Sequence, residues 1–256
     1  ALVLEDEGEA LEVERAARLR TRGCVLVASS QESAVRVAGA PRVLVAELRV
    51  AGGLEEGSEV LIDSDVAVGF PIPADPYAST PLPPLDTAPA EAIDHDNLGT
   101  TFVHPGVHSG FAATGGRVVL LTGVHQFEGP IVLSGEAQLE LQSATLRFGP
   151  VGRLTLSDRA EVMGAASDQL PGWEDFWVLQ EAGARTWNLT DSAEIDIKGH
   201  IYAPTTRILL EGSSRMDTGT LVAGAVRVRG DAVLRLRESI EPLEGTSVPG
   251  RAKLVR

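Results

Sequence analysis

The sequence predicts an all-β fold, a single-stranded parallel β-helix that we expect to be right-handed. One hydrophobic pattern occurs twice in succession, in residues 199–216 (GHIYAPTTRILLEGSSRM) and 219–234 (GTLVAGAVRVRGDAVL). Each copy holds short runs with apolar side chains at alternate positions, which is the period of a strand with one buried face. Because neither copy can bury its inner face alone, successive copies must stack into a continuous core.

A second pattern marks the corners of these coils. A turn residue, a polar residue and a small residue precede an alternating strand in 135–141, 157–162, 191–197, 212–216 and 230–236. Small residues let the backbone bend sharply, and Gly adopts positive φ at little cost. Further short strands are expected at 118–121, 131–133, 145–148 and 154–156. Such strands are too short for an ordinary β-sandwich, which is the competing architecture.

Composition agrees with a narrow aliphatic core. The chain has 27 Gly and 15 Pro but only 2 Tyr, 3 Trp and 6 Phe, and 43% of its 256 residues are hydrophobic. This amount of apolar sequence is enough for one elongated folded domain. The formal net charge of -14 argues against binding to nucleic acid or to an anionic membrane, because both need a clustered basic face. We interpret Arg227, Arg229, Arg235 and Arg237, which alternate with apolar residues, as a solvated outer face.

The chain divides into three regions and a tail. Residues 1–69 are expected to form N-terminal coils, with strands at 10–13, 24–28, 34–37, 43–45 and 48–50. A helix over residues 5–20 is the alternative there, because Leu4, Leu11 and Leu19 are compatible with a helical face.

Residues 70–100 are rich in proline and should run as extended chain, either as a linker or as a long loop packed on the outside of the same domain. Residues 101–240 form the main coils, interrupted by an excursion at 164–183 that holds two of the three Trp residues. The tail at 241–256 has no periodicity.

Several motifs resemble a known family. They are the run GHIYAP at 199–204, then EGSS at 211–214, GTLVA at 219–223 and GDAVLRL at 230–236, with weaker matches at 29–39, 52–53, 75–84, 104–108 and 121–135. Together they resemble the C-terminal domain of TadG-like and PilX-like proteins, which accompany bacterial tight-adherence and type IV pili. Three features depart from the family pattern. His108 and His125 stand where relatives have Tyr, Thr122 replaces a Pro, and the additional cysteines of relatives are missing.

The resemblance implies an extracellular β-helical domain without established catalytic activity. Its expected partners are pilus or cell-surface proteins and glycans, with no nucleic acid. The chain starts at Ala1 without Met and holds no run as long as a membrane helix. We therefore expect a mature or engineered fragment of a protein held at the cell surface through a removed N-terminal segment. The lone Cys24 excludes an internal disulfide and is interpreted as a small residue inside a strand.

No catalytic constellation stands out, and no cofactor is expected. Parallel β-helices also host polysaccharide lyases and hydrolases, whose chemistry needs carboxylates that converge on one outer face. Carboxylates are plentiful here but scattered, and the close pairs are Asp63 with Asp65 and Asp94 with Asp96. The sequence contains no nucleophile elbow and no phosphate-binding loop. A carbohydrate-active β-helix enzyme stays as an alternative.

Two groups of residues are candidate sites. Asp94, Asp96, His104 and His108 carry groups that bind metals, although Pro105 and Gly106 forbid a helix that would align the two imidazoles. The alternative is that these residues fill turns and solvated loops.

The second group is Trp173, Phe176 and Trp177, which would form an exposed patch for a sugar or a protein partner. The alternative is that these three side chains fold down and cap the core. The sequence thus favours a non-enzymatic domain that acts in pilus assembly, adhesion or surface attachment. A self-associating filament unit is a further alternative, because an uncapped coil exposes strand edges.

Overall fold

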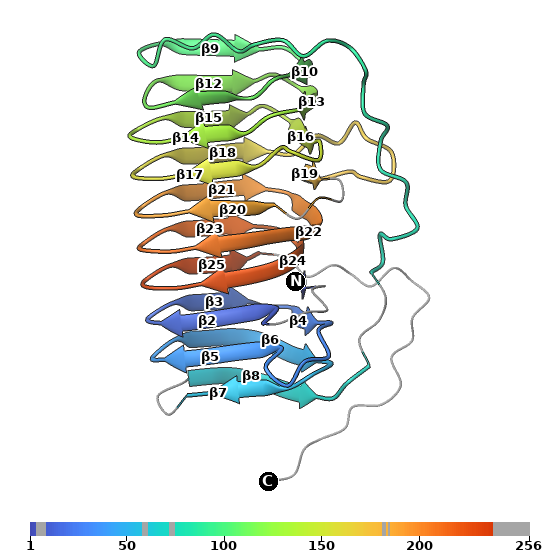
Figure 1. Ribbon diagram of the computed structural model, residues 1–256, viewed down its shortest axis with the longest axis vertical. Helices are drawn as coiled ribbons and strands as arrows, with labels where there is room; N and C mark the ends of the chain where they lie inside the picture. The colour runs from blue at the N-terminus through green and yellow to red at the C-terminus, as the bar shows by residue number, and fades with distance from the viewer. Residues whose placement is uncertain (4–8, 58–60, 72–74, 181–182, 184, 238–256) are drawn as a thin grey trace.

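A computed structural model gives the fold of the chain and describes residues 1–237, except 4–8, 58–60, 72–74, 181–182 and 184. The described residues are all-β, without a helix, and their parallel strands stack as a β-solenoid of about 11 turns (Figure 1). The strands are β1 Leu2–Val3, β2 Leu11–Arg15, β3 Arg18–Thr21, β4 Cys24–Val27, β5 Val35–Gly39, β6 Arg42–Val50, β7 Leu54–Glu56, β8 Leu61–Val68, β9 Thr100–Val103, β10 Gly106–His108, β11 Phe111–Ala113, β12 Arg117–Leu120, β13 Gly123–Phe127, β14 Ile131–Leu133, β15 Gln138–Leu141, β16 Ala144–Phe148, β17 Leu154–Leu156, β18 Glu161–Ala165, β19 Phe176–Gln180, β20 Thr186–Leu189, β21 Glu194–Lys198, β22 His200–Leu210, β23 Arg215–Thr218, β24 Leu221–Val228 and β25 Val233–Leu236. The predicted fold class is confirmed.

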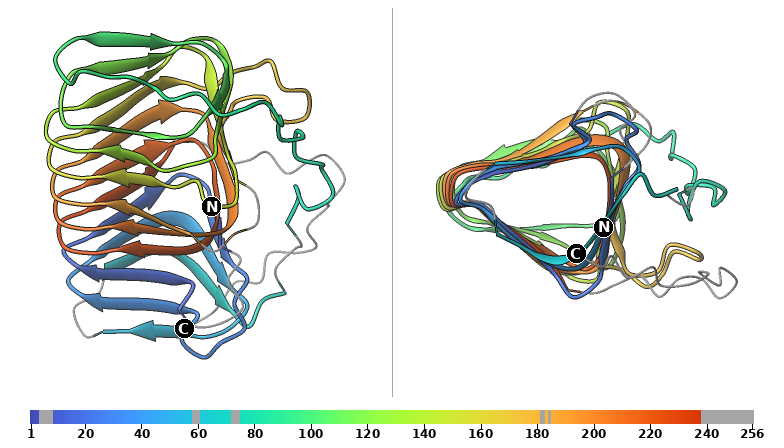
Figure 2. Two further views of the ribbon diagram at one scale, coloured as in Figure 1. Left: turned by 45° about the horizontal axis from the view of Figure 1, so that its top comes forward. Right: turned by 90° about the horizontal axis from the view of Figure 1, so that it is seen from below.

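Three faces enclose the core, and the cross-section is triangular (Figure 2). We name them by the strands that stack in each. Sheet A holds β9, β12, β15, β18, β21, β23, β25, β3 and the first parts of β6 and β8. Sheet B holds β10, β13, β16, β19, the first parts of β22 and β24, then β1, β4 and the second parts of β6 and β8. Sheet C holds β11, β14, β17, β20, the second parts of β22 and β24, then β2, β5 and β7.

The coils do not stack in chain order. The N-terminal strands β1 to β8 form a lower block, and β9 to β25 form an upper block (Figure 1). The two blocks meet where β24 pairs with β1 and β2, and where β25 pairs with β3. We call this contact the joint. It pairs opposite ends of the chain, so the solenoid is continuous in space although the chain is not continuous across it.

The register shows how closely the two ends fit. Leu236 of β25 lies opposite Thr21, and Leu2 of β1 lies opposite Leu26. Since Thr21 and Leu26 are close neighbours in the coil below, β25 and β1 occupy successive sides of one coil above it. The chain therefore enters the solenoid at the place where its last described strand ends.

Residues 69–71 and 75–99 lie between β8 at the bottom of the lower block and β9 at the top of the upper block, along the outside of sheet B (Figure 2). We call this segment the strap. The sequence left open a linker or a long loop on the outside of the domain, and the described strap residues bond to successively higher coils of sheet B. At its upper end Glu91 forms a parallel β-bridge with His108, and Ile93 packs against the core.

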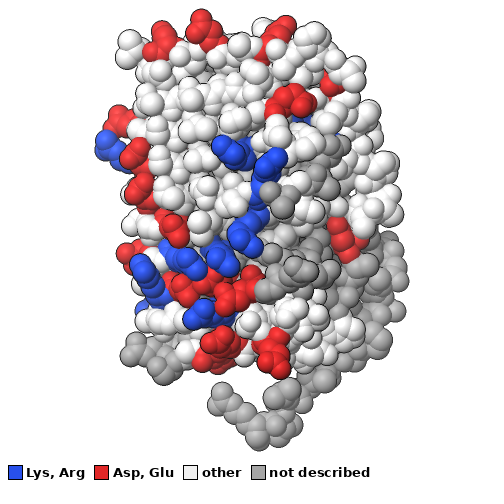
Figure 3. Space-filling model, in the orientation of Figure 1, with Lys and Arg blue, Asp and Glu red and all other residues white. Residues whose placement is uncertain are grey.

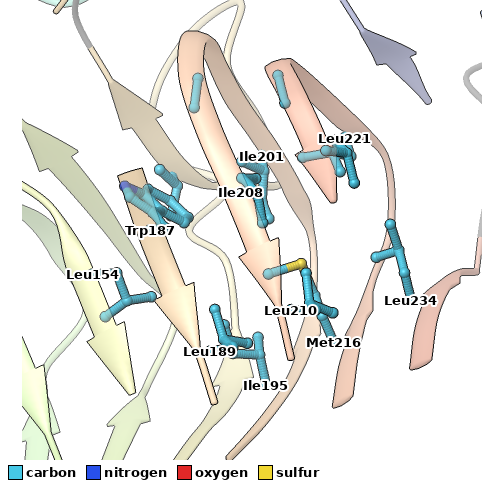
Figure 4. Packing of buried hydrophobic residues seen from close by; sticks show 14 of the residues in the cluster. Leu154, Trp187, Leu189, Ile195, Ile201, Ile208, Leu210, Met216, Leu221 and Leu234 are labelled. Carbon is cyan, nitrogen blue, oxygen red and sulfur yellow. The ribbon is translucent and has the colours of Figure 1, made fainter. Parts of the chain in front are cut away.

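The core repeats from coil to coil. Trp187 lies over Ile208, Leu189 over Leu210, and Ile195 over Met216 and then Leu234 (Figure 4). All of these side chains are buried. The stacking confirms that the two similar segments recognised in the sequence are consecutive coils.

The predicted corner pattern lies between sheets C and A. The backbone is left-handed at the first residue of several of these segments, with φ of 60° at Gly135, 69° at Gly212 and 76° at Gly230, whereas in the segment 157–162 it is the second residue, Asp158, that has a φ of 58°. Two positions further on, Ala137, Ala160, Ala193, Ser214 and Ala232 are all fully buried. A small side chain is needed there because sheets C and A converge at this corner.

Some boundaries differ from the sequence prediction. The excursion was expected at 164–183, but residues 176–180 form β19 of sheet B, so the described part of the excursion lies between β18 and β19. The alternative helix at 5–20 is wrong for the described part of that range, which is β2 and β3. The tail at 241–256 lies outside the described residues.

The bottom coil has an edge. Within the described ranges β7 pairs with β5 and β8 pairs with β6, and neither has a second neighbour. Asp63 and Asp65 are exposed on β8. Charged side chains on an edge strand are a common means by which proteins oppose edge-to-edge pairing.

Candidate functional site

The three aromatic side chains predicted as an exposed patch are buried. Trp173 is 1% exposed, Phe176 is 3% exposed and Trp177 is fully covered. Trp177 points into the solenoid interior, where its indole nitrogen donates to Thr218 Oγ1 at 3.1 Å. Trp173 and Phe176 lie outside sheet B, beneath the strap. The structure thus shows the alternative in which these residues cap the core, and not an exposed aromatic patch.

Trp173 and Phe176 belong to an aromatic cluster that fastens the strap. Tyr77 of the strap stacks on Trp173 at 5.5 Å between ring centroids and meets Phe176 and Tyr202 edge-on. The Tyr202 hydroxyl donates to Asp75 Oδ2 at 2.9 Å. Burial, together with this hydrogen bond, raises the pKa of Tyr202. We call these residues the clasp, and they give the excursion a structural role.

The strap covers one outward-facing row of sheet B. The row consists of Val107, Gln126, Arg147, Leu179, Tyr202, Val222 and Leu2, each directly opposite the next. Gln126 exchanges hydrogen bonds with the backbone of Asp86 at 2.6 and 2.9 Å, and Arg147 donates to the Pro83 carbonyl at 3.3 Å. Because the strap covers them, Gln126 and Arg147 are buried although they lie on the outer side of sheet B. The row is therefore occupied by the chain's own residues.

The four predicted metal ligands are not brought together. Asp96 accepts hydrogen bonds from the backbone of Leu98 and Gly99, both at 3.0 Å. Asp94 and His104 are exposed, whereas His108 is buried. Among the residues whose positions are described, no group of three or more His, Cys, Asp or Glu could hold a metal ion. The metal-site prediction is corrected accordingly, because Asp96 is engaged by the backbone of its own turn and His108 is buried.

His108 instead pairs with His125 in the next coil. Their rings are stacked at 5.4 Å, with 3.3 Å between His108 Nε2 and His125 Nδ1, and His125 Nε2 lies 2.8 Å from the Leu121 carbonyl oxygen. Burial lowers the pKa of both imidazoles, and the pKa of His125 falls to about 4. This pair is neutral near pH 7 and acts as packed polar core.

The carboxylates do not converge into an acid pair at the positions that the sequence suggested. Asp63 and Asp65 are both exposed on the edge strand. An open depression of about 830 Å³ lies at the corner of the upper coils and includes Glu136 and Glu161. Arg159 pairs with Glu136 at 2.5 Å, and Gln138 donates to Glu161 at 3.3 Å. These partners hold the two carboxylates in place on the solenoid surface.

Sheet C carries charges of alternating sign across the joint. Arg227, Glu12, Arg36 and Glu55 lie directly opposite one another in successive coils. Figure 3 shows the resulting mixture of basic and acidic side chains over β24, β2 and β5. Glu12 is only 1% exposed, and its carboxylate lies 3.0 Å from Arg227 Nε and 2.8 Å from Arg229 Nη2. Such opposed pairs stabilise neighbouring strands.

Sheet A has a different arrangement at the same level. Arg18, Arg20, Arg22 and Arg42 are exposed in the lower block, and Arg235 of the upper block is exposed beside them. We call these five residues the arginine patch. Arg20 lies directly opposite Arg235, and Arg18 lies directly opposite Arg42. Like charges in such positions repel each other.

Few carboxylates neutralise this patch. Arg235 lies 3.7 Å from Asp217, which also accepts a hydrogen bond from Arg237 at 2.7 Å. In the described part of the chain, Arg18, Arg20, Arg22 and Arg42 form no ion pair with a carboxylate. The sequence analysis interpreted Arg235 as part of a solvated face and did not single out the N-terminal arginines. Their alternation in the segment RLRTR at 18–22 was the available signal.

Comparisons of the chain with protein-family models, with curated proteins and with solved structures found no match. Within the described residues, no helix has the length and apolar character needed to cross a membrane. The geometry of the solenoid faces is therefore the basis on which a function is proposed.

Proposed function

We propose that this chain is a non-enzymatic β-solenoid domain of a bacterial cell-surface or pilus-associated protein, and that it acts in assembly, adhesion or surface attachment. The observation that carries the proposal is the arginine patch on sheet A. It presents exposed side chains in straight rows on a rigid, flat sheet, which suits binding of an extended partner. The sequence resemblance to TadG-like and PilX-like domains supports the same role.

The strap and clasp support a role that needs a rigid body. The strap connects the two blocks along sheet B. In the clasp, Tyr77 of the strap packs against Trp173 of the excursion. Both features resist separation of the coils at the joint. A domain that connects a surface to its partner benefits from such resistance, because a loose coil would expose strand edges.

Self-association into filaments is less well supported than adhesion. The free edge at β7 and β8 would have to pair with another copy, and an antiparallel pairing centred on Ser64 would set Asp63 of one copy against Asp65 of the other. Opposed carboxylates destabilise strand pairing. The strap segment at Glu91 and Ile93 also covers the top coil, which hinders head-to-tail stacking.

The experiment compares two substitutions in one strand in the bacterium that makes the protein. Leu210→Asp places a charge in the fully buried core, whereas Leu209→Asp changes the neighbouring side chain on the outside of β22. We expect the first variant to lose surface attachment or piliation and the second to retain it. Normal attachment by a Leu210→Asp strain that lacks folded protein would refute the proposal.

A biochemical control addresses the enzyme alternative. The purified chain is incubated with acidic and neutral polysaccharides, and new reducing ends and unsaturated uronates are measured. We expect neither product. Release of either product, abolished by substitution of a pair of carboxylates, would replace the proposed role by catalysis.

A further inference from the structure

We propose that the arginine patch binds an acidic polysaccharide, a chain of sugars that carry carboxylate groups, laid across the coils at the joint. This inference rests on the proposed function, because it names the class of ligand for the adhesive face. It is argued from charge, spacing and the neighbouring side chains.

The first observation is that arginines of the patch lie directly opposite one another and that few carboxylates neutralise them. On sheet C the directly opposed residues at the joint alternate in sign, and higher on sheet A Arg215 pairs with Glu194 at 3.7 Å. At the patch, the opposed residues are Arg20 with Arg235 and Arg18 with Arg42. An anion placed between the members of each pair would replace repulsion by two favourable contacts.

The second observation is the spacing of the two Arg–Arg pairs. Adjacent coils are separated by about 4.8 Å, and residues two apart in a strand by about 6.7 Å. The pair of Arg18 and Arg42 is displaced from the pair of Arg20 and Arg235 by one coil and by two residues. Their midpoints are therefore about 8 Å apart. A ligand that fits both must carry at least two anionic groups at about this separation, so it is a polymer or a long oligomer.

The third observation is the character of the neighbouring positions. Val233 and Leu44 occupy the same rows as the arginines and are partly exposed, and Leu61 follows Arg42 with 52% exposure. Aliphatic side chains between guanidinium groups suit a ligand that has both anionic groups and apolar C–H faces, as a sugar acid does. The strands β25, β3 and β6 carry no aromatic residue, whereas single-stranded nucleic acid is usually held by stacking on aromatic rings.

The patch is also narrow. Asp217 borders it above and Asp63 borders it below, and the whole chain has a formal net charge of -14. A DNA duplex or an anionic bilayer would bring many negative charges against these carboxylates. A single polysaccharide chain can cross the patch without meeting them. These features favour an acidic polysaccharide over the larger polyanions.

The patch exists only when the joint is closed, because Arg235 comes from the upper block and the other arginines come from the lower block. A ligand that binds both blocks must stabilise the closed joint, since it binds the folded form alone. The inference thus couples ligand binding to the stability of the solenoid.

The test uses polygalacturonate as the probe and uncharged dextran as the reference. Binding to the purified chain is measured by biolayer interferometry at low and physiological salt. We expect polygalacturonate to bind, binding to weaken as salt rises, and Arg18→Gln/Arg20→Gln to lower the affinity about tenfold or more. The matched control is Arg153→Gln/Arg159→Gln, which removes the same charge from exposed arginines away from the patch and should bind as the parent chain does.

Thermal unfolding provides a second readout. Polygalacturonate should raise the melting temperature of the parent and of the control, but not that of the patch variant. Without ligand, the patch variant should melt at or above the parent temperature, because the substitution removes a repulsion. This result would also show that weaker binding does not come from misfolding.

Three results would overturn the inference. They are equal losses in the patch and control variants, no binding of polygalacturonate by the parent, and equally tight binding of polyglutamate or single-stranded DNA through the same arginines. The last result would make the patch a general site for acidic peptides or nucleic acids. Failure of polygalacturonate binding together with normal attachment of the Leu209→Asp strain would refute the ligand class while leaving the proposed surface role in place.

Discussion

Glu12→Gln should weaken the joint by a measurable amount. The side chain keeps its shape, but the hydrogen bond from Arg229 and the ion pair with Arg227 lose their negative partner. A hydrogen bond to a charged group contributes about 1.5 to 3 kcal/mol. The arginines are 27% and 34% exposed, so water replaces part of the loss. Taking the low end for the hydrogen bond and adding a partly screened ion pair, we expect a loss of about 2 kcal/mol and a decrease in melting temperature of about 4 to 8 °C.

The assay is thermal unfolding followed by circular dichroism at pH 7, with Glu56→Gln as the control. Glu56 is exposed in β7, so this substitution should change stability by less than about 0.5 kcal/mol. Burial raises the pKa of Glu12, but the hydrogen bonds from Arg229 and Glu14 and the charges of Arg229 and Arg227 together outweigh it, so the net pKa is lowered. A lowered carboxylate pKa stabilises the fold above the unfolded value of about 4.3, and this stabilisation is lost as the pH falls through the folded pKa. The difference between Glu12→Gln and the parent should therefore shrink in acid. Equal melting temperatures for Glu12→Gln and Glu56→Gln at pH 7 would refute the buried-charge argument.

Three further predictions address the topology, the strap and the core. A circular permutant that joins Arg237 to Ala1 through two added residues, with new ends in the strap, should give the same β-rich spectrum and assemble as a monomer; an unfolded product would contradict the arrangement of the joint. Tyr202→Phe removes the hydrogen bond to Asp75 and should cost about 1 kcal/mol while increasing the rate of proteolysis in the strap; unchanged proteolysis would show that the clasp does not hold it. Burial lowers the pKa of His125 to about 4, so the unfolded chain takes up the proton first and stability should fall as the pH drops from about 6.5 to about 4. The loss should approach about 3 kcal/mol in denaturant titrations, and His125→Gln should flatten the dependence; an equally steep curve in the variant would exclude His125 as its source.

Sequence reasoning was most successful where the periodicity was local. The alternation in β14, β17 and β22 and the corner residues at Gly135 and Gly212 predicted strands and turns correctly, because each coil must bury the same face in the same way. The proline content of residues 70–100 likewise predicted an extended segment outside the coils. These features depend on neighbours within a few residues.

Prediction from the sequence was less successful where segments distant in the chain meet. Trp173 and Phe176 were candidates for an exposed patch, with burial against the core as the favoured alternative, but nothing in their own segment indicated that Tyr77 of the strap covers them. The candidate metal ligands Asp94, Asp96, His104 and His108 were close in sequence, but among the described residues they do not form a group of three that could hold a metal ion. The cover over the aromatic side chains depends on where the strap runs, which alternation within a strand does not encode.

By itself, the sequence indicated the class of fold, because short alternating strands with repeated small-residue corners favour stacked parallel coils over a β-sandwich. The tertiary structure decided the order of those coils and therefore the surface. Arg20 and Arg235 lie far apart in the chain and become neighbours only through the pairing of β25 with β3. Pairing of strand edges depends on which edges meet in space, and this is why the arginine patch and the buried Glu12 were visible only after the two blocks had been placed together.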